Sequence, residues 1–544
     1  MSHKFLPLAA TGAATLALLL GALGPLAPQV FAANAAKPGN GVIVDGLFEE
    51  PDTLNPTQGP GETYSIMVES TLFQNLYTTE PNGSIVPNIA TTVPTIANGG
   101  ISKNGLDYTF TLKHTEWSNG TPFTAQDVIA TWKLITSAGY VPISTSGWTD
   151  IQVIHAINPY KFEVVLKTPF QALLADCFSS EDTGIVPAQV FAHLTGKAAN
   201  DATFNHAPTI SNGPFMFKSW IPGTSITVVP NPHWFGPKVK AKQITFEIVP
   251  NDNTLLADIQ AHSINVFWFA PIEDLSALKA IPGANVDMYQ LPAWESADVN
   301  FRDPFLDNVK VREALEMAID RNALIKKVWD GYATPIAADQ TALSWAHNPA
   351  LKPLPYDPTE AKKLLAQAGF TMGSNGYLEK GGKEFTITYS STSGDPFRAL
   401  DEELIQAWFR AVGVNMKIQN FPANAFFGTL LPSGKTWDLA EFEDLDGTDP
   451  GATMYSSYDG TSVENFGAFN DPTLNTLLTQ QQSELTQAER QVTLRKAEAV
   501  IAQQLPELFL YSPDMIAVSQ GITGYDPNPW TVDTWNSWDW AVKG

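Results

Sequence analysis

Five carboxylic acids lie within nine residues of this sequence: Glu441, Glu443, Asp444, Asp446 and Asp449. Charges this close repel one another, so the segment is unfavourable unless its side chains face solvent or a cation. Three kinds of chemistry would use it: calcium binding, acid–base hydrolysis, and recognition of a positively charged ligand. A solvated loop with no chemical role is the remaining interpretation.

The spacing of the acids narrows these alternatives. An EF-hand loop requires glycine at its sixth position, and the run 444–447 (D-L-D-G) does not provide that spacing. A secreted hydrolase with a carboxylate pair needs two acids from different elements, roughly 5 to 10 Å apart across a cleft. Here the acids share one short segment. We therefore expect no metal and no catalytic residue, and retain the hydrolase only as an alternative.

Other reactive residue types form no recognisable site. The eight histidines show no H-x-x-x-H spacing, which weighs against a zinc or nickel site. The sequence contains no G-x-S-x-G, G-x-x-x-x-G-K-[ST] or G-x-G-x-x-G motif. Cys177 is the only cysteine, so no disulfide can form within the chain. These observations predict a protein that uses no cofactor and is not an enzyme.

Composition and charge limit the class of protein. The chain has 544 residues, which suggests about three to four domain-sized units, and 44% of its residues are hydrophobic. It has 56 acidic residues against 32 lysines and arginines, a net charge of −24. Nucleic acid is a poor partner because its binding needs clustered cations. Low charge density with excess acid also favours an acidic habitat, where carboxylates are partly protonated.

Residues 1–35 have the pattern of a secretory signal peptide. Lys4 precedes an apolar run over 5–26, and small residues follow it. Uncleaved, the segment could act as a membrane anchor, although its glycines and prolines make it a weak spanning helix. No cysteine stands at the expected cleavage site for lipid attachment. We expect an extracytoplasmic protein, periplasmic or cell-surface associated or secreted, with a net charge of −25 once Lys4 is removed.

Periodicity and capping residues predict the elements that position the acidic segment. A strand over 437–440 leads into it, and a helix over 396–412 and a strand over 414–418 precede it. A helix over 487–504 follows it. Elsewhere we predict strands over 41–47 and 160–170, helices over 65–77 and 358–368, and a helix over 305–321 in which Arg312 pairs with Glu316.

The stretch 107–132 shows the clearest local pattern. Tyr108 and Phe110 alternate with polar residues, as in a strand with one buried face. Thr124 fits a helix N-cap with Asp127 as its capping-box partner, so a helix should start at the next residue. The same stretch, Y-T-F-x-L-(six residues)-S-N-G-T-P-F-T-A-x-D-V, resembles the signature of the extracytoplasmic solute-binding proteins of peptide-type ABC transporters, the oligopeptide and dipeptide binder family (family 5).

Further blocks follow the family's order along nearly the whole mature chain. They include ISNGPFMFKSWIPG at 210–223, NPHWFGP at 231–237 and V-R-x-A-(five residues)-D-R at 311–321. The resemblance implies a two-lobed α/β periplasmic-binding-protein fold (type II, cluster C) with an additional subdomain. Ligand would bind in a cleft between lobes that close by a hinge motion. Two crossing segments would lie near 290–299 and 507–512.

The resemblance also implies domain boundaries and a function. Residues 36–76, 207–293 and 509–544 would form lobe I, 77–206 the additional subdomain, and 294–508 lobe II. The protein would be the monomeric substrate-binding component of an ABC importer, which captures an oligopeptide and delivers it to a membrane permease. An oligosaccharide is the alternative ligand within the same fold.

Roles for the acidic segment come from the same resemblance. D-G-T-D-P at 446–450 resembles the family's D-x-x-(acid)-P block, whose first aspartate pairs with the α-ammonium of a bound peptide. Asp446 is therefore the expected anchor, and Asp444 is the alternative. Glu443 stands where peptide binders often have tryptophan, so the adjoining pocket should be more polar. Main-chain groups would bind an extended ligand on one side at Phe442, Glu443 and Asp444, and on the other at Glu49, Glu50 and Pro51.

No partner for the ligand's carboxylate is evident. The positions of the family's arginines hold Thr392 and Ala440 here. Arg398 lies close enough to substitute, although an arginine in the first turn of a helix is more often a surface residue. Trp294 and Trp437 could stack on a sugar or on an apolar side chain. These features leave the choice between peptide and oligosaccharide open.

Overall fold

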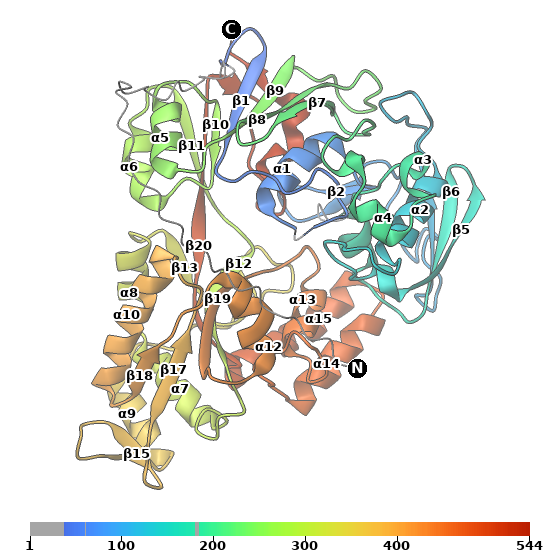
Figure 1. Ribbon diagram of the computed structural model, residues 1–544. Coiled ribbons are helices and arrows are strands. Elements are labelled where there is room, and N and C mark those ends of the chain that lie inside the picture. The colour runs from blue at the N-terminus through green and yellow to red at the C-terminus, as the bar shows by residue number, and fades with distance from the viewer. Residues whose placement is uncertain (1–36, 60, 180–183, 544) are drawn as a thin grey trace, which may run out of the picture. The chain divides into compact units, whose positions relative to one another are not determined.

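The computed structural model describes residues 37–59, 61–179 and 184–543, so the predicted signal peptide lies outside the described residues. Within the described ranges no helix is long and apolar enough to cross a membrane. One large mixed sheet dominates the fold (Figure 1). Its strands are β1 (Val42–Leu47), β7 (Phe215–Ile221), β8 (Ser225–Pro230), β9 (Gln243–Ile248), β10 (Val266–Trp268), β11 (Ala284–Gln290), β12 (Ala293–Val299), β13 (Ala333–Pro335), β17 (Thr386–Ser390), β18 (Asn415–Ile418), β19 (Leu439–Leu445) and β20 (Glu507–Gln520).

Strand β20 belongs to both halves of this sheet. The strand order is β18-β17-β19-β12-β20-β10-β1-β9-β8-β7, with β11 and β13 also paired to β20. Residues 507–513 pair with β12 and β13, and residues 514–520 pair with β10 and β11. Only Leu291 and Pro292 separate β11 from β12, so a second crossing runs beside β20. The expected two-lobed α/β fold with two crossings is confirmed.

Helices cover both faces of the lobe II half of the sheet. Side chains alternate along each strand, so Leu508 packs with one group of helices and Phe509 with the other. The first group is α7 (Val309–Ala318), α8 (Arg321–Val328), α9 (Pro358–Gln367) and α10 (Pro396–Ala411). The second group is α13 (Pro450–Tyr458), α14 (Pro472–Ser483) and α15 (Gln487–Gln504). The acidic segment therefore begins on a strand that is packed on both faces, and the side chains of Glu443 and Leu445 are exposed near its end.

The segment predicted as an additional subdomain folds around a small antiparallel sheet. It contains β4 (Asp107–Thr111), β5 (Ile151–Asn158) and β6 (Lys161–Leu166), in the order β4-β6-β5, with α2 (Ala125–Ile135) beside them. Its apolar side chains join one core with α1 (Thr63–Leu72) and the lobe I strands. A shared core fixes this part of the chain against lobe I, although the exact domain boundaries remain a prediction.

Local capping signals were good predictors of helix starts. Thr124 is the N-cap of α2, and its backbone N–H donates to Asp127 Oδ2 at 2.7 Å, completing the capping box. Tyr108 and Phe110 are buried in β4, as expected. The predicted helices that became α9, α10 and α15 begin at the residues proposed for them.

Two local predictions were wrong because tertiary contacts override them. The helix expected over 65–77 ends at Leu72, since Phe73 turns extended and 77–79 form β2 (Tyr77–Thr79), paired with β3 (Ile85–Pro87). Arg312 does not pair with Glu316. Its guanidinium donates instead to the carbonyls of Gln504 and Leu306, at 2.6 to 2.9 Å. Glu316 forms an ion pair with Arg321.

Gly213, in the N-G-P segment before β7, has no room for a side chain. A Cβ there would lie 2.6 Å from backbone atoms of Thr71 and Leu72. Gly213→Ala should therefore lower the free energy of unfolding by about 1–3 kcal/mol, the usual cost of overpacking. Urea denaturation would measure it, with Gly428→Ala as control because a Cβ at Gly428 meets nothing within 4 Å. Equal stabilities of the two variants would refute the steric argument.

Candidate ligand-binding site

The acidic segment is not the solvated loop considered above. Residues 441–445 lie in β19, and Asp449 is the N-cap of α13. Because side chains alternate along a strand, the acids of β19 lie on opposite faces of the sheet. Glu441 pairs across the sheet with Ala297 on the α7–α10 side, whereas Asp444 pairs with Trp294 on the α13–α15 side. Asp446 follows the end of the strand and lines a cavity.

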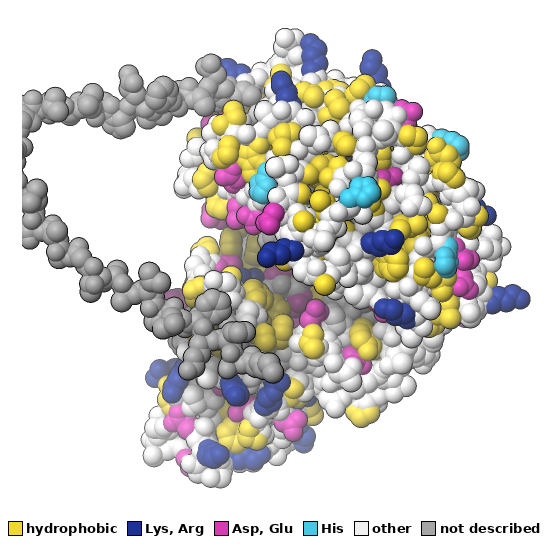
Figure 2. Space-filling view, turned by 45° about the vertical axis from the view of Figure 1, so that its right-hand side comes forward, with side chains coloured by type: hydrophobic (Ala, Val, Ile, Leu, Met, Phe, Trp, Pro, Cys, Tyr) yellow, Lys and Arg dark blue, Asp and Glu magenta, His cyan; other side chains and the backbone are white. Residues whose placement is uncertain are grey.

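This first cavity has a volume of about 400 Å³ and lies where the lobes and the additional subdomain meet. Figure 2 shows the surface hollowed between its upper and lower parts, with charged side chains mostly scattered singly. A second cavity of about 530 Å³ shares Thr448 and Trp530 with the first. Polar residues of the first cavity include Thr63, Thr79, Ser144, Ser146, Asp176, Asp446 and Thr448.

Asp446 is an unpaired buried acid. Its side chain is almost closed off from solvent, at 3% exposure, and neither carboxylate oxygen forms a well-aligned hydrogen bond. Burial raises its pKa to about 8, against the opposing effect of nearby Thr453 and Gln340. An uncompensated buried charge is costly, so this carboxyl is stable either protonated or with a cationic partner. It can therefore act as a receptor for an ammonium group.

Three contacts fix the loop that carries Asp446. The Asp446 backbone N–H donates to the carbonyl of Pro292, at the crossing, at 2.7 Å. Asp449 forms a buried ion pair with Arg490 of α15, with N–O distances of 2.5 and 2.6 Å. The Trp345 indole N–H donates to the carbonyl of Thr448 at 3.0 Å. The loop of Asp446 is thus held from the hinge, from α15 and from the segment 339–348.

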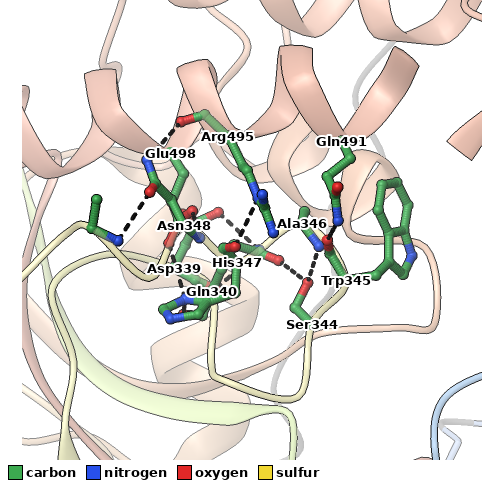
Figure 3. A network of polar contacts seen from close by, with 11 residues as sticks. Asp339, Gln340, Ser344, Trp345, Ala346, His347, Asn348, Gln491, Arg495 and Glu498 are labelled. Atoms are coloured by element: carbon green, nitrogen blue, oxygen red, sulfur yellow. Dashed lines mark hydrogen bonds and ion pairs between the residues drawn. The ribbon is translucent and has the colours of Figure 1, made fainter. Parts of the chain in front are cut away.

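The segment 339–348 is itself attached to α15 (Figure 3). Gln491 donates to the Trp345 carbonyl at 2.5 Å, and Arg495 donates to the His347 carbonyl at 3.0 Å. Glu498 accepts from the Asn348 backbone N–H at 2.6 Å and raises the pKa of His347. This network connects α15 to the second cavity, which Trp345 lines.

Aromatic residues that the sequence did not single out line the first cavity. Trp268 is the last residue of β10, Phe269 follows it, and Trp530 comes from the C-terminal segment. Phe269 has φ of 56°, a left-handed conformation that is strained for a residue with a side chain. Such strain often marks binding sites. The only sequence signal was the aromatic run at 267–269.

Several predicted contacts lie away from the Asp446 cavity. Phe442 and Asp444 line a third cavity of about 390 Å³, and Glu443 is exposed. Glu49, Glu50 and Pro51 line none of the three cavities, and the Glu50 carboxylate accepts hydrogen bonds from Trp220 and Gly223, both at 2.9 Å. The structure therefore brings only Asp446, among the predicted ligand contacts, into the first cavity.

Arg398, Trp294 and Trp437 are already engaged by the protein. Arg398 forms an ion pair with Glu295 at 2.7 Å and donates to Thr392 Oγ1 at 2.8 Å, beside the position where a carboxylate anchor was sought. Trp294 and Trp437 are fully buried, so neither offers a ring face for stacking on a ligand. These placements argue against the roles proposed for the three side chains.

One group of carboxylates has the spacing to hold a cation. Asp298, Asp444 and Glu507 line the third cavity, with oxygens within 4.8 Å of one another. Glu507 already accepts hydrogen bonds from Tyr458 and Ser296, at 2.6 and 2.7 Å. Clustered acids alone do not define a metal site, and nothing else in the described part of the chain points to one.

Comparison with known proteins identifies relatives. Residues 84–465 match the family described as "Bacterial extracellular solute-binding proteins, family 5 Middle". The oligopeptide-binding protein AppA of Bacillus subtilis is 23% identical over 524 residues, covering 90% of this chain and 93% of AppA. Its structure with a nonapeptide has a TM-score of 0.77 at 22% identity, covering 92% and 99% of the two chains. NikZ of Campylobacter jejuni, solved with Ni(L-His), has a TM-score of 0.77 at 23% identity, covering 93% and 100%.

Proposed function

This chain belongs to the bacterial extracellular solute-binding proteins of family 5, and from that premise we propose that it captures an oligopeptide beside Asp446. The peptide would then pass to the membrane permease of an ABC importer. The supporting observation is the buried, unpaired Asp446 carboxyl in a cavity between the lobes. Its partner would be the α-ammonium of the peptide, and closure of the lobes would keep that ion pair out of water. The protein would act as a monomer outside the cytoplasm.

The charges lining the two adjoining cavities favour an oligopeptide over a dipeptide. No lysine, arginine or histidine lines the first cavity among the described residues, and Arg490 in the second is paired with Asp449. A dipeptide would place its carboxylate near the ammonium site with no cation to receive it. A longer peptide can run past Thr448 into the second cavity and leave its carboxylate elsewhere.

The ligand class can be tested directly. The mature protein would be purified, co-purifying molecules identified, and thermal shifts measured with peptide and oligosaccharide libraries. Stabilisation by peptides is expected because a ligand that binds only the folded state raises the unfolding temperature. Stabilisation by oligosaccharides alone would replace the peptide with the sugar as ligand. Asp176 and Asp446 both line the first cavity, so hydrolysis of a bound library member would support the hydrolase alternative instead.

Peptide binding should strengthen as pH rises from about 5 to 8. Burial raises the pKa of free Asp446 to about 8, and the ammonium of a bound peptide favours the charged form. Binding below this pKa therefore releases a proton, and affinity should rise by up to about tenfold per pH unit. Above about pH 8 the peptide amine loses its own proton and affinity should fall.

Isothermal titration calorimetry in buffers of different ionisation enthalpy would count the released proton. A sugar bound by the protonated carboxyl would show the opposite trend, with affinity constant at acidic pH and falling above about pH 8. Peptide affinity that is flat between pH 5 and 8 would contradict Asp446 as the ammonium partner.

A further inference from the structure

A second set of acids is buried on the other side of β19 from Asp444, at the hinge end of lobe II. Glu441 on β19 and Asp401 on α10 are both at 0% exposure, and Glu295 on β12 is at 6%. These three acids come from β19, α10 and β12. Strand β12 follows one crossing and pairs with β20, which forms the other. None of them lines the ligand cavities.

Glu441 forms no well-aligned hydrogen bond as a carboxylate, although the hydroxyl of Tyr389 on β17 lies close to it. Neither of its oxygens has a partner, and the Oδ1 atom of Asp401 has none either. The Oδ2 atom of Asp401 accepts from the hydroxyl of Tyr511, on β20, at 2.5 Å. The Glu441 and Asp401 side chains are within hydrogen-bonding reach of each other. Two ionised carboxylates cannot form that bond, whereas a carboxyl and a carboxylate can.

The other charged groups facing this pair do not neutralise it. Arg398 of α10 is the one cation among the groups that act on Glu441, and it is bound by Glu295. Glu402 accepts from Ser391 and from Asn420, and these hydrogen bonds oppose the effect of burial, which raises its pKa. The remaining titratable neighbours are Asp395 on α10, Glu443 on β19 and the hydroxyls of Tyr389 on β17 and Tyr511 on β20.

We propose that Glu441 and Asp401 share a proton, which acts as a pH-sensitive lock on the hinge end of lobe II. With the proton in place, Glu441 donates to Asp401 and connects β19 to α10, while Tyr511 connects the same carboxyl to β20. Loss of the proton leaves two buried negative charges in contact and loosens the packing of these elements. The lock is therefore closed at acidic and neutral pH and opens at alkaline pH.

The direction of the pH effect follows from linkage. Burial and the charge of Asp401 raise the pKa of Glu441, and burial raises the pKa of Asp401 to about 8. An acid whose pKa is higher in the folded state contributes full stability below its unfolded pKa, near 4. That contribution is lost as pH rises through the folded value. The lock fits the acidic habitat predicted from composition.

Glu441→Gln tests the lock because an amide donates to Asp401 but cannot ionise. The unfolding temperature of the unmodified protein should fall by about 3 °C or more between pH 6 and 9, relative to that of the variant. Glu403→Gln is the matched control, since Glu403 is exposed on the same helix as Asp401. Curves for Glu441→Gln and Glu403→Gln that change identically with pH would overturn the proposal.

A second measurement does not depend on the pH range in which the variants fold. At about pH 7 the exposed acids are ionised. Infrared spectra of the folded protein should nevertheless contain the carbonyl band of protonated carboxyls, and this band comes from buried groups. The difference spectrum between the unmodified protein and Glu441→Gln should isolate one such group. Absence of that band from the difference spectrum would show that Glu441 is ionised and that the lock does not exist.

Discussion

Asp446→Asn is expected to weaken the binding of an amine-bearing peptide by roughly 30-fold or more. Removing one partner of a buried, hydrogen-bonded charge pair costs about 2–5 kcal/mol, and about 1.4 kcal/mol corresponds to tenfold in affinity. Asparagine preserves the shape of Asp446 and removes its charge. Because the free carboxyl is buried without a partner, the substitution should also stabilise the ligand-free protein slightly at pH above 8. Calorimetric titration with a peptide found in the library screen would measure the loss.

Asp444→Asn is the matched control for that experiment. Asp444 was the alternative anchor, but it lines the third cavity and not the cavity that contains Asp446. Its substitution should change peptide affinity by less than about threefold. A large loss in Asp444→Asn with none in Asp446→Asn would move the anchor to the third cavity. Equal affinities of both variants and the unmodified protein would remove the ammonium anchor altogether.

Features of the fold set by short-range interactions could be predicted from the sequence. The capping box of Thr124 with Asp127 depends on two side chains three residues apart, and the helix begins where it predicts. The alternation in β4 is equally local. The family blocks supplied the longer-range arrangement, which no local pattern contains: two lobes joined at 291–292 and through β20.

Side-chain partners were poorly predicted because they come from distant parts of the chain. Arg312 and Glu316 have ideal helical spacing, yet each is bound to a different group. An exposed pair at this spacing contributes only about 0.3–0.5 kcal/mol, whereas these side chains are buried and must satisfy all their hydrogen bonds. Arg398 shows the same effect, since its partner Glu295 lies 103 residues away in sequence.

The binding cavity shows what sequence reasoning could and could not find. Asp446 was identified through a motif, and it lines the cavity. Trp268, Phe269 and Trp530 were missed because they meet there only after the chain has folded, and the positive φ of Phe269 has no sequence signal. The acidic segment appeared to be a loop because its charges hid the period-two pattern of a strand in which the acid Glu441 is fully buried.

Arg490→Leu is expected to reduce the free energy of unfolding by about 3–5 kcal/mol. Arg490 is buried, holds Asp449 through two short ion-pair contacts and donates to Gln481 at 2.8 and 3.0 Å. Leucine keeps much of the volume of the arginine side chain but leaves the charge of Asp449 buried and unpaired. Removing one partner of a buried ion pair is strongly destabilising for this reason. Urea denaturation would measure the loss, with Lys496→Leu on the exposed side of the same helix as control.

Removing both charges separates two contributions to the free energy of unfolding. One is the contribution of the ion pair, and the other is the cost of leaving the Asp449 carboxylate buried without a partner. The double variant Asp449→Asn/Arg490→Leu should recover much of the lost stability, because asparagine remains a good N-cap for α13 without a buried charge. A double variant as unstable as Arg490→Leu would show that packing, and not charge, dominates. Since Asp449 lies three residues after Asp446, peptide affinity should fall in both variants if the pair fixes the loop of Asp446. If the pair serves stability alone, both folded variants should keep the affinity of the unmodified protein.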